Sequence, residues 1–82
     1  MKTPRDLTGI ELATALKGLG YEITRQRGSH IRLTTTIHGE HHITVPAHNP
    51  VKPGTLNSIL ADVASHFSIS KTEAIARIFD WQ

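Results

Sequence analysis

The sequence predicts an α+β domain in which a helix, three antiparallel strands and a second helix follow one another, with a short third helix at the C-terminus. Three observations support this class. Apolar residues recur at helical spacing near both ends of the chain. Two short segments combine a hydroxyl residue with a glutamate three positions later, which is a helix-start pattern. Between them the chain alternates in polarity and is interrupted by glycines, as strands and turns are.

The composition fits a small domain without disulfide bonds. The length of 82 residues is that of one domain, with a core expected over residues 1–69 and an additional helix over 70–82. No cysteine is present, which excludes disulfides and thiolate metal sites. The start MKTPRDLTG lacks the apolar core of a signal peptide, and no apolar run has the length of a membrane span. We therefore expect a soluble cytoplasmic protein.

The charge is unevenly distributed along the chain. The net charge is +2, but residues 1–54 carry seven Lys or Arg against four acidic residues, whereas residues 55–82 carry two against three. Five of the six histidines also fall between Arg27 and His48. A positive surface attracts phosphates whatever sequence they carry, so this half of the chain is the expected contact for an anionic partner.

The first helix has a start signal, an apolar stripe and a stop signal. Thr8 and Glu11 have the spacing of a capping box, and Gly20 is the expected end. The stripe between them consists of Leu12, Ala15, Leu16 and Leu19. Three strands are then expected at about 21–26, 30–38 and 42–48, with Gly28 and Gly39 in the two turns.

The second helix is the clearest in the chain. Its apolar residues, at helical spacing, are Leu56, Ile59, Leu60, Val63, Ala64 and Phe67. Ser70 and Glu73 form a second capping box that opens the third helix, which has Ile75, Ile78 and Phe79 on one side. This short apolar stripe either closes the core of the same chain or contacts a partner, and burial within the chain is the simpler expectation.

The strand register follows from keeping apolar residues on one face. A three-residue loop, 39–41, places Ile37 opposite Ile43, and a loop of residues 27–29 places Ile23 opposite Leu33. The residues then expected to face the helices are Tyr21, Ile23, Ile31, Leu33, Ile37, Ile43, Val45 and Ala47. The opposite face, called the open face below, is expected to carry Glu22, Thr24, Gln26, His30, Arg32, Thr34, Thr36, His38, His42 and Thr44.

The same register gathers four polar side chains at one end of the open face, while His38 and His42 pair at the other end. These four are Gln26, His30, Arg32 and His48. An imidazole transfers protons near neutral pH, and a guanidinium holds a phosphate oxygen in fixed geometry, so the group is a candidate phosphodiester site. The alternative interpretation is that these residues are ordinary polar strand surface, and spacing alone leaves both open.

Two further groups have competing interpretations. A metal site from His38, His41 and His42, with Glu40 as a possible fourth ligand, conflicts with strand alternation, so surface histidines are the better account. In the loop NPVKPGTL, Lys52 precedes a helix N-terminus that could bind an anion, but the same residues are also ordinary loop and capping residues.

Two stretches, GSHIRL and ITVPAHNPVKPGTLNSIL, carry a resemblance to a known family. With the initial helix and its Gly20-Tyr21 exit, their order and spacing resemble the HicA-type toxins, also called YcfA-like proteins, of bacterial toxin-antitoxin pairs. The resemblance covers most of the chain. The final segment SISKTEAIARIFDWQ and the histidine-rich second turn depart from many members.

The resemblance implies a double-stranded-RNA-binding-like fold, a ribosome-independent ribonuclease acting on messenger RNA, and neutralisation by a HicB-type antitoxin. Because RNA supplies its own nucleophile, the ribose 2′-hydroxyl, we expect a metal-independent reaction that uses no cofactor. It also implies that His30, the histidine of the Gly-Ser-His motif, is the residue needed for cleavage. We expect RNA contacts from Gln26, Arg27, Gly28, Ser29, Arg32, His48 and Lys52. His48 is the candidate for a second proton-transfer group.

Two other kinds of function compete with a nuclease. A non-catalytic RNA-binding or protein-binding module on the same fold would bind without cutting. A metal-binding domain would take up zinc in fixed proportion and depend on it for folding. Incubation with labelled RNA in EDTA separates the three, whereas fold alone does not, because one fold supports many functions.

Overall fold

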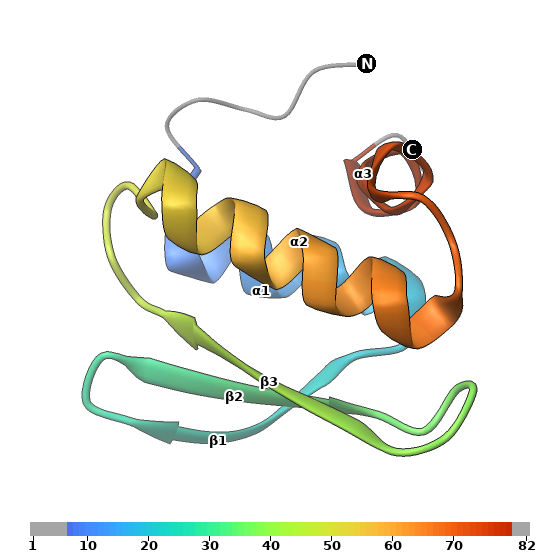
Figure 1. Ribbon diagram of the computed structural model, residues 1–82. Helices are drawn as coiled ribbons and strands as arrows, with labels where there is room; N and C mark the ends of the chain where they lie inside the picture. Colours follow the sequence, from blue (N-terminus) through green and yellow to red (C-terminus); the bar gives the residue numbers. More distant parts are fainter. Residues whose placement is uncertain (1–6, 80–82) are drawn as a thin grey trace.

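A three-stranded antiparallel sheet carries the helices on one of its two faces in the computed structural model, which describes residues 7–79 (Figure 1). The elements in chain order are α1 (Gly9–Leu16), the 3-10 helix η1 (Lys17–Leu19), β1 (Glu22–Arg27), β2 (His30–Thr35), β3 (His41–Pro46), α2 (Pro53–Phe67) and α3 (Lys71–Phe79). The strands lie side by side in the order β1, β2, β3. The predicted α+β class and order of elements are confirmed.

Helix α1 begins with the predicted capping box. The Thr8 hydroxyl accepts from the Glu11 amide at 3.1 Å, and the Glu11 carboxylate accepts from the Thr8 amide at 2.9 Å. These two bonds satisfy amides that have no partner inside the helix. The last turn tightens into η1, and Gly20 ends it with φ of 84°. The predicted end of the helix is confirmed.

Helix α2 buries its predicted apolar stripe in the core, where it contacts β3 and α3. The six residues predicted from helical spacing are the six that are buried: Leu56, Ile59, Leu60, Val63, Ala64 and Phe67. Pro53 occupies the first turn, where its missing amide hydrogen costs nothing, and Ser68 ends the helix with φ of 56°.

Helix α3 closes the core of this chain. The Ser70 hydroxyl accepts from the Glu73 amide at 3.0 Å, which is the capping half of the predicted box. Ala74 and Ile78 are buried, and Ile78 belongs to the same apolar cluster as α1, α2 and the sheet. The expectation that the stripe of α3 is buried within the chain is confirmed for this part of the helix. Residues 80–82 lie outside the described residues.

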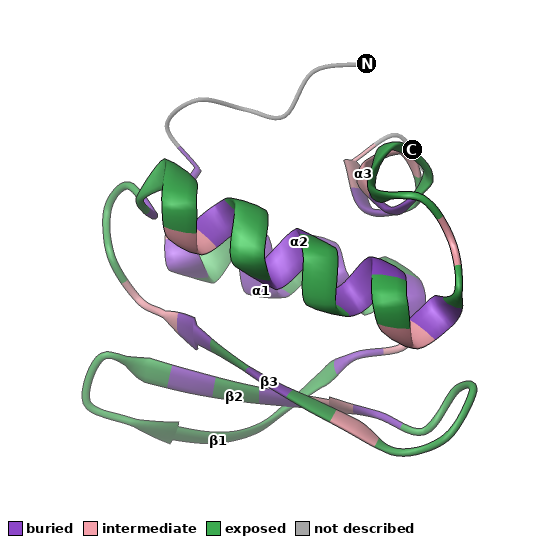
Figure 2. Ribbon diagram, viewed as in Figure 1, coloured by how far each residue is buried: buried purple, intermediate pink, exposed green. Residues whose placement is uncertain are grey.

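The helix side of the sheet holds the predicted centre of the core. Ile31, Leu33, Ile43 and Val45 are buried, as alternation along β2 and β3 requires. In Figure 2 these two strands alternate between buried and exposed residues, whereas β1 is exposed along its whole length. Strand β1 is therefore the thinly covered edge of the sheet.

Two isoleucines predicted to be in the core are exposed. Ile23 is 44% exposed and Ile37 is 51% exposed. Ile23 lies on the edge strand, and Ile37 lies in the loop after β2, where its side chain reaches Gly20 instead of the core. The burial of these two residues was predicted wrongly because periodicity shows neither how far the helices cover β1 nor where β2 ends.

The register between β2 and β3 also differs from the prediction. Leu33 lies opposite Ile43, and Thr35 lies opposite His41, so five residues, 36–40, form the loop. Strand β2 ends early because the buried Thr35 hydroxyl bonds to the Leu19 carbonyl and accepts from the Ile37 amide. The slip is an even number of residues, so the buried face keeps its residues although the partners change.

The register between β1 and β2 departs from the prediction through a bulge. Ile23 lies opposite Leu33 as predicted, but the register shifts between Ile23 and Arg25. Arg27 then pairs with His30, and the turn contains two residues, Gly28 and Ser29, instead of three. A bulge reverses which side chains face the helices on one side of it. Residues after Thr24 on β1 therefore have the opposite orientation to the one predicted.

No helix within residues 7–79 is long and apolar enough to span a membrane.

Candidate functional site

The Gly-Ser-His motif forms a tight turn and the first residue of β2. Gly28 has φ of 58°, a left-handed conformation that glycine adopts without steric cost. The Ser29 carbonyl accepts from the Ala47 amide at 2.6 Å, which ties the turn to the chain that leaves β3. His30 is exposed, with Arg27 opposite it on β1 and Pro46 opposite it on β3.

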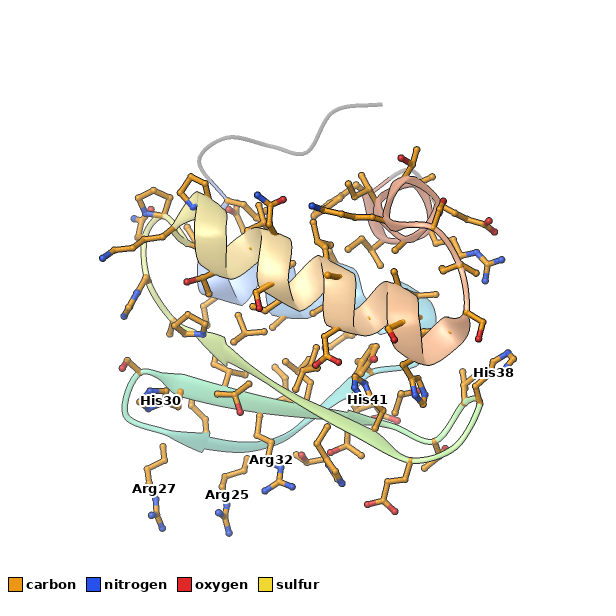
Figure 3. All side chains as sticks on the ribbon, viewed as in Figure 1. Arg25, Arg27, His30, Arg32, His38 and His41 are labelled. Carbon is orange, nitrogen blue, oxygen red and sulfur yellow. The ribbon has the colours of Figure 1, made fainter. Side chains whose placement is uncertain are left out.

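A second cationic pair lies two residues further along β2. Arg32 is exposed and lies opposite Arg25 on β1 and Thr44 on β3. Figure 3 shows Arg25, Arg27 and Arg32 projecting from the open face of the sheet. Arg25 is not among the site residues predicted from the sequence. The sequence does contain a pattern that predicts its position. Gly-Ser is typical of a two-residue hairpin turn, and a two-residue turn at Gly28 and Ser29 places Arg25 opposite Arg32.

These side chains make the end of the open face next to the β1–β2 turn positively charged. We call Arg25, Arg27, His30 and Arg32 the basic cluster. Within residues 7–79, no ion pair joins any of the three guanidinium groups to a carboxylate, and the His30 ring makes no hydrogen bond. Uncompensated positive charge on an open surface attracts anions.

Two residues predicted to be in this group lie elsewhere. Gln26 lies opposite Ile31, so the bulge turns its side chain to the helix side of the edge strand. His48 is exposed beyond the end of β3, and its carbonyl accepts from the Gly9 amide at 2.9 Å. Thr44 occupies the position opposite Arg32 that was predicted for His48. The predicted positions of Gln26 and His48 are wrong because both followed from the loop lengths.

Lys52 stands at the start of α2. It is the exposed N-cap residue of the helix, and its side chain makes no capping hydrogen bond. Its carbonyl accepts from the Leu56 amide at 2.9 Å, which is ordinary helix-start geometry. Figure 1 shows this end of α2 on the helix side of the sheet, away from the open face.

The other end of the open face carries a row of hydrogen-bonded polar side chains that crosses all three strands. The Thr24 and Thr34 hydroxyls lie 3.1 Å apart, Thr34 Oγ1 lies 2.8 Å from Nδ1 of His42, and Nε2 of His42 lies 2.7 Å from Glu40 Oε2. A carboxylate only accepts, so Nε2 of His42 donates to Glu40, and Nδ1 is hydrogen-bonded to the Thr34 hydroxyl. Both nitrogens of His42 are engaged, in contrast to those of His30.

His41 points to the helix side, opposite to its neighbour His42. Its Nδ1 lies 2.7 Å from the Tyr21 hydroxyl, and its Nε2 lies 3.3 Å from Asp62 on α2. Burial raises the pKa of the Tyr21 hydroxyl well above its ordinary value, and the Asp62 charge adds to the effect. Tyr21 therefore stays protonated, and its hydroxyl and the Asp62 carboxylate engage the two ring nitrogens of His41, with Nε2 donating to the carboxylate.

Two further histidines pack at the junction of the β2–β3 loop and α2. The His66 ring stacks on His41 with centroids 4.4 Å apart, and its Nε2 donates to the Ile37 carbonyl at 2.9 Å. His38 has φ of 60° and packs its ring edge to face on Phe67, with centroids 5.6 Å apart. The predicted pairing of His38 with His42 is therefore wrong, and the hydrogen bond from His66 holds the loop on α2.

The histidines considered as metal ligands do not converge. His41 faces α2, and His42 faces the open side, as strand alternation predicts. Among the residues of the described range, no three His, Asp or Glu side chains are arranged to hold a metal ion.

Together these features define a class: a small α+β domain with helices on one face of a three-stranded sheet and a basic cluster on the other. Residues 9–64, more than half of the chain, match the family described as the HicA toxin of bacterial toxin-antitoxin systems. The chain belongs to this family and is the toxin of such a pair, which implies an antitoxin as its partner. Neither a curated protein nor a solved structure gives a significant match.

Proposed function

We propose that this toxin is a metal-independent endoribonuclease that cleaves messenger RNA on the open face of its sheet, with His30 as the general acid/base. The observation that carries the proposal is the state of the His30 ring. It is exposed, it makes no hydrogen bond within residues 7–79, and Arg27 and Arg32 flank it on the same face. A free imidazole among guanidinium groups combines a proton carrier with phosphate binding.

The reaction uses the nucleophile that RNA itself supplies. His30 removes the proton from a ribose 2′-hydroxyl, whose oxygen attacks the adjacent phosphorus while the bond from phosphorus to the 5′ oxygen breaks. The products are a 2′,3′-cyclic phosphate and a 5′-hydroxyl end. Arg27, which lies directly opposite His30, binds the non-bridging oxygens on which negative charge grows in the transition state.

The leaving 5′ oxygen also needs a proton. His48 was the sequence-based candidate, but the position opposite Arg32 belongs to Thr44. His42 lies on the open face but has both nitrogens engaged, and it is four residues along the sheet from the His30 row. We therefore assign base catalysis to His30 and the second proton to solvent.

The test is cleavage of a labelled single-stranded RNA by purified protein in EDTA. His30→Ala is expected to lower the cleavage rate by about a hundred- to ten-thousand-fold, the usual contribution of general acid/base catalysis. His48→Ala is the matched control, because it removes an exposed histidine outside the cluster, and it is expected to keep the wild-type rate. Circular dichroism checks that all variants are equally folded.

Two results would reject the mechanism. A fully active His30→Ala protein would remove the general acid/base assignment. Cleavage of an otherwise identical strand in which every sugar is 2′-deoxyribose would show that the ribose 2′-hydroxyl is not the nucleophile. Tight RNA binding by the wild-type protein without any products would instead favour the non-catalytic module as its function.

The partner implied by the family is, in this proposal, a HicB-type antitoxin. Adding an equimolar amount of such an antitoxin, encoded beside this toxin, is expected to stop RNA cleavage. Unchanged cleavage in a stable complex of the two proteins would show that binding does not neutralise the nuclease.

A further inference from the structure

The bulge at Thr24 decides which β1 side chains lie on the open face. If the ladder continued regularly from the pair Ile23 and Leu33, Gln26 would lie opposite His30, and Arg25 would lie opposite Ile31 on the helix side. The register shift instead places Arg25 opposite Arg32 and turns Gln26 away. Bulges are frequent next to active sites, where they change the direction of a side chain.

The arrangement that results does not help the sheet to fold. Like charges directly opposite on neighbouring strands are destabilising. Here the guanidinium groups of Arg25 and Arg32 lie opposite each other, and within residues 7–79 no carboxylate pairs with either of them or with Arg27. Glu40 on the same face is engaged with His42. An anion bound between the guanidinium groups would supply the missing negative charge.

We propose that Arg25 is an RNA-binding residue that, together with Arg32, holds the phosphate next to the scissile one. This inference rests on the proposed function. Directly opposed residues have Cβ atoms about 5 Å apart, so both guanidinium groups reach one phosphate. The row of His30 and Arg27 lies two residues away, about 6.6 Å along the strand, similar to the spacing of successive phosphates in an extended strand. RNA then runs along β1 and β2 with consecutive phosphates on consecutive rows.

The experiment measures binding separately from cleavage. All variants carry His30→Ala, and a short fluorescein-labelled single-stranded RNA is titrated by anisotropy at several KCl concentrations. Arg25→Gln is expected to weaken binding about tenfold, the value of a hydrogen-bonded charge pair at the lower end of its range. The slope of log affinity against log salt is expected to fall by about 0.7, because one phosphate contact is lost from a single strand.

Two control variants separate position from net charge. Arg25→Gln combined with Gln26→Arg keeps the composition but moves the guanidinium to the helix side, and it is expected to bind as weakly as Arg25→Gln alone. Arg77→Gln removes a positive charge from α3, where Arg77 pairs with Glu73, and it is expected to bind as the parent does. The urea midpoint of Arg25→Gln is expected to equal or exceed that of the parent, since the opposition to Arg32 is relieved.

The outcomes distinguish this inference from the proposed function. If the His30→Ala parent binds RNA and Arg25→Gln does not weaken this binding, Arg25 is not an RNA-binding residue. The same follows if the variant that combines Arg25→Gln with Gln26→Arg binds RNA as tightly as the parent does. Either result leaves the proposed function standing. A parent that binds no RNA, together with a wild-type protein that cuts none, overturns both.

Discussion

Replacing Gly9 by alanine tests the closest approach between the helices and the sheet. Gly9 is the first residue of α1, and its amide donates to the His48 carbonyl at 2.9 Å. A Cβ atom at this position would lie 2.1 Å from the Pro46 carbonyl oxygen and 2.7 Å from the Ala47 Cα. Both are backbone atoms, so no side-chain rotation relieves the overlap. The start of α1 has to move away from the end of β3.

The expected cost has two parts. Overpacking at a close contact costs about 1–3 kcal/mol, and weakening the bond from Gly9 to His48 costs about 1 kcal/mol. Gly9→Ala is therefore expected to lower the free energy of unfolding by about 2–4 kcal/mol. A domain of this size unfolds with about 4–12 kcal/mol, so the loss is a large fraction of the total. The melting temperature is expected to fall by at least about 8 °C.

The assay is urea unfolding of purified protein followed by far-ultraviolet circular dichroism. Gly54→Ala is the matched control, since Gly54 lies in the first turn of α2 and an added Cβ there meets nothing within 4 Å. Gly54→Ala is expected to be neutral or to stabilise by up to about 1 kcal/mol, because alanine restricts the unfolded chain more than glycine does. The two substitutions are chemically identical, so an opposite sign isolates the packing.

One result would refute this reasoning. If Gly9→Ala changes the free energy of unfolding by no more than Gly54→Ala does, then α1 and β3 do not approach each other as closely as the distances state.

Three further predictions concern stability. Leu33→Ala is expected to lower the free energy of unfolding in urea by about 2–5 kcal/mol, and Ile23→Ala by less than about 1 kcal/mol. The two residues are paired across β1 and β2, but Leu33 is fully buried and Ile23 is 44% exposed. Equal decreases in the two variants would contradict this difference in burial. Thr8→Ala is expected to cost about 1 kcal/mol through loss of the cap, and no change in the urea midpoint would count against the cap. Because the pKa of Tyr21 is raised in the folded protein, the unfolded chain loses the tyrosine proton first as the pH rises through about 10. The free energy of unfolding of the wild-type protein is therefore expected to fall above this pH by up to about 1.4 kcal/mol per pH unit more than that of Tyr21→Phe. Parallel curves of stability against pH for the two proteins would contradict the shift.

The helices and the composition of the buried face could be predicted because the information is local. The capping box of Thr8 and Glu11 and the apolar stripe of α2 depend on residues three or four positions apart. Strand alternation likewise assigned Ile31, Leu33, Ile43 and Val45 to the core, although their partners were wrong, because a slip by an even number of residues preserves the face.

In the candidate site, the sequence pattern correctly predicted the exposure of His30 and Arg32 from the period of two along β2, and it placed a turn at Gly28 and Ser29. The predicted turn wrongly included Arg27, which pairs with His30. The tertiary structure decided that Arg25 lies beside Arg32, that Gln26 faces away and that His48 lies past the strand. The physical reason is that a bulge and a loop length depend on contacts between strands, such as the early end of β2 at Thr35. No spacing along the chain records those contacts.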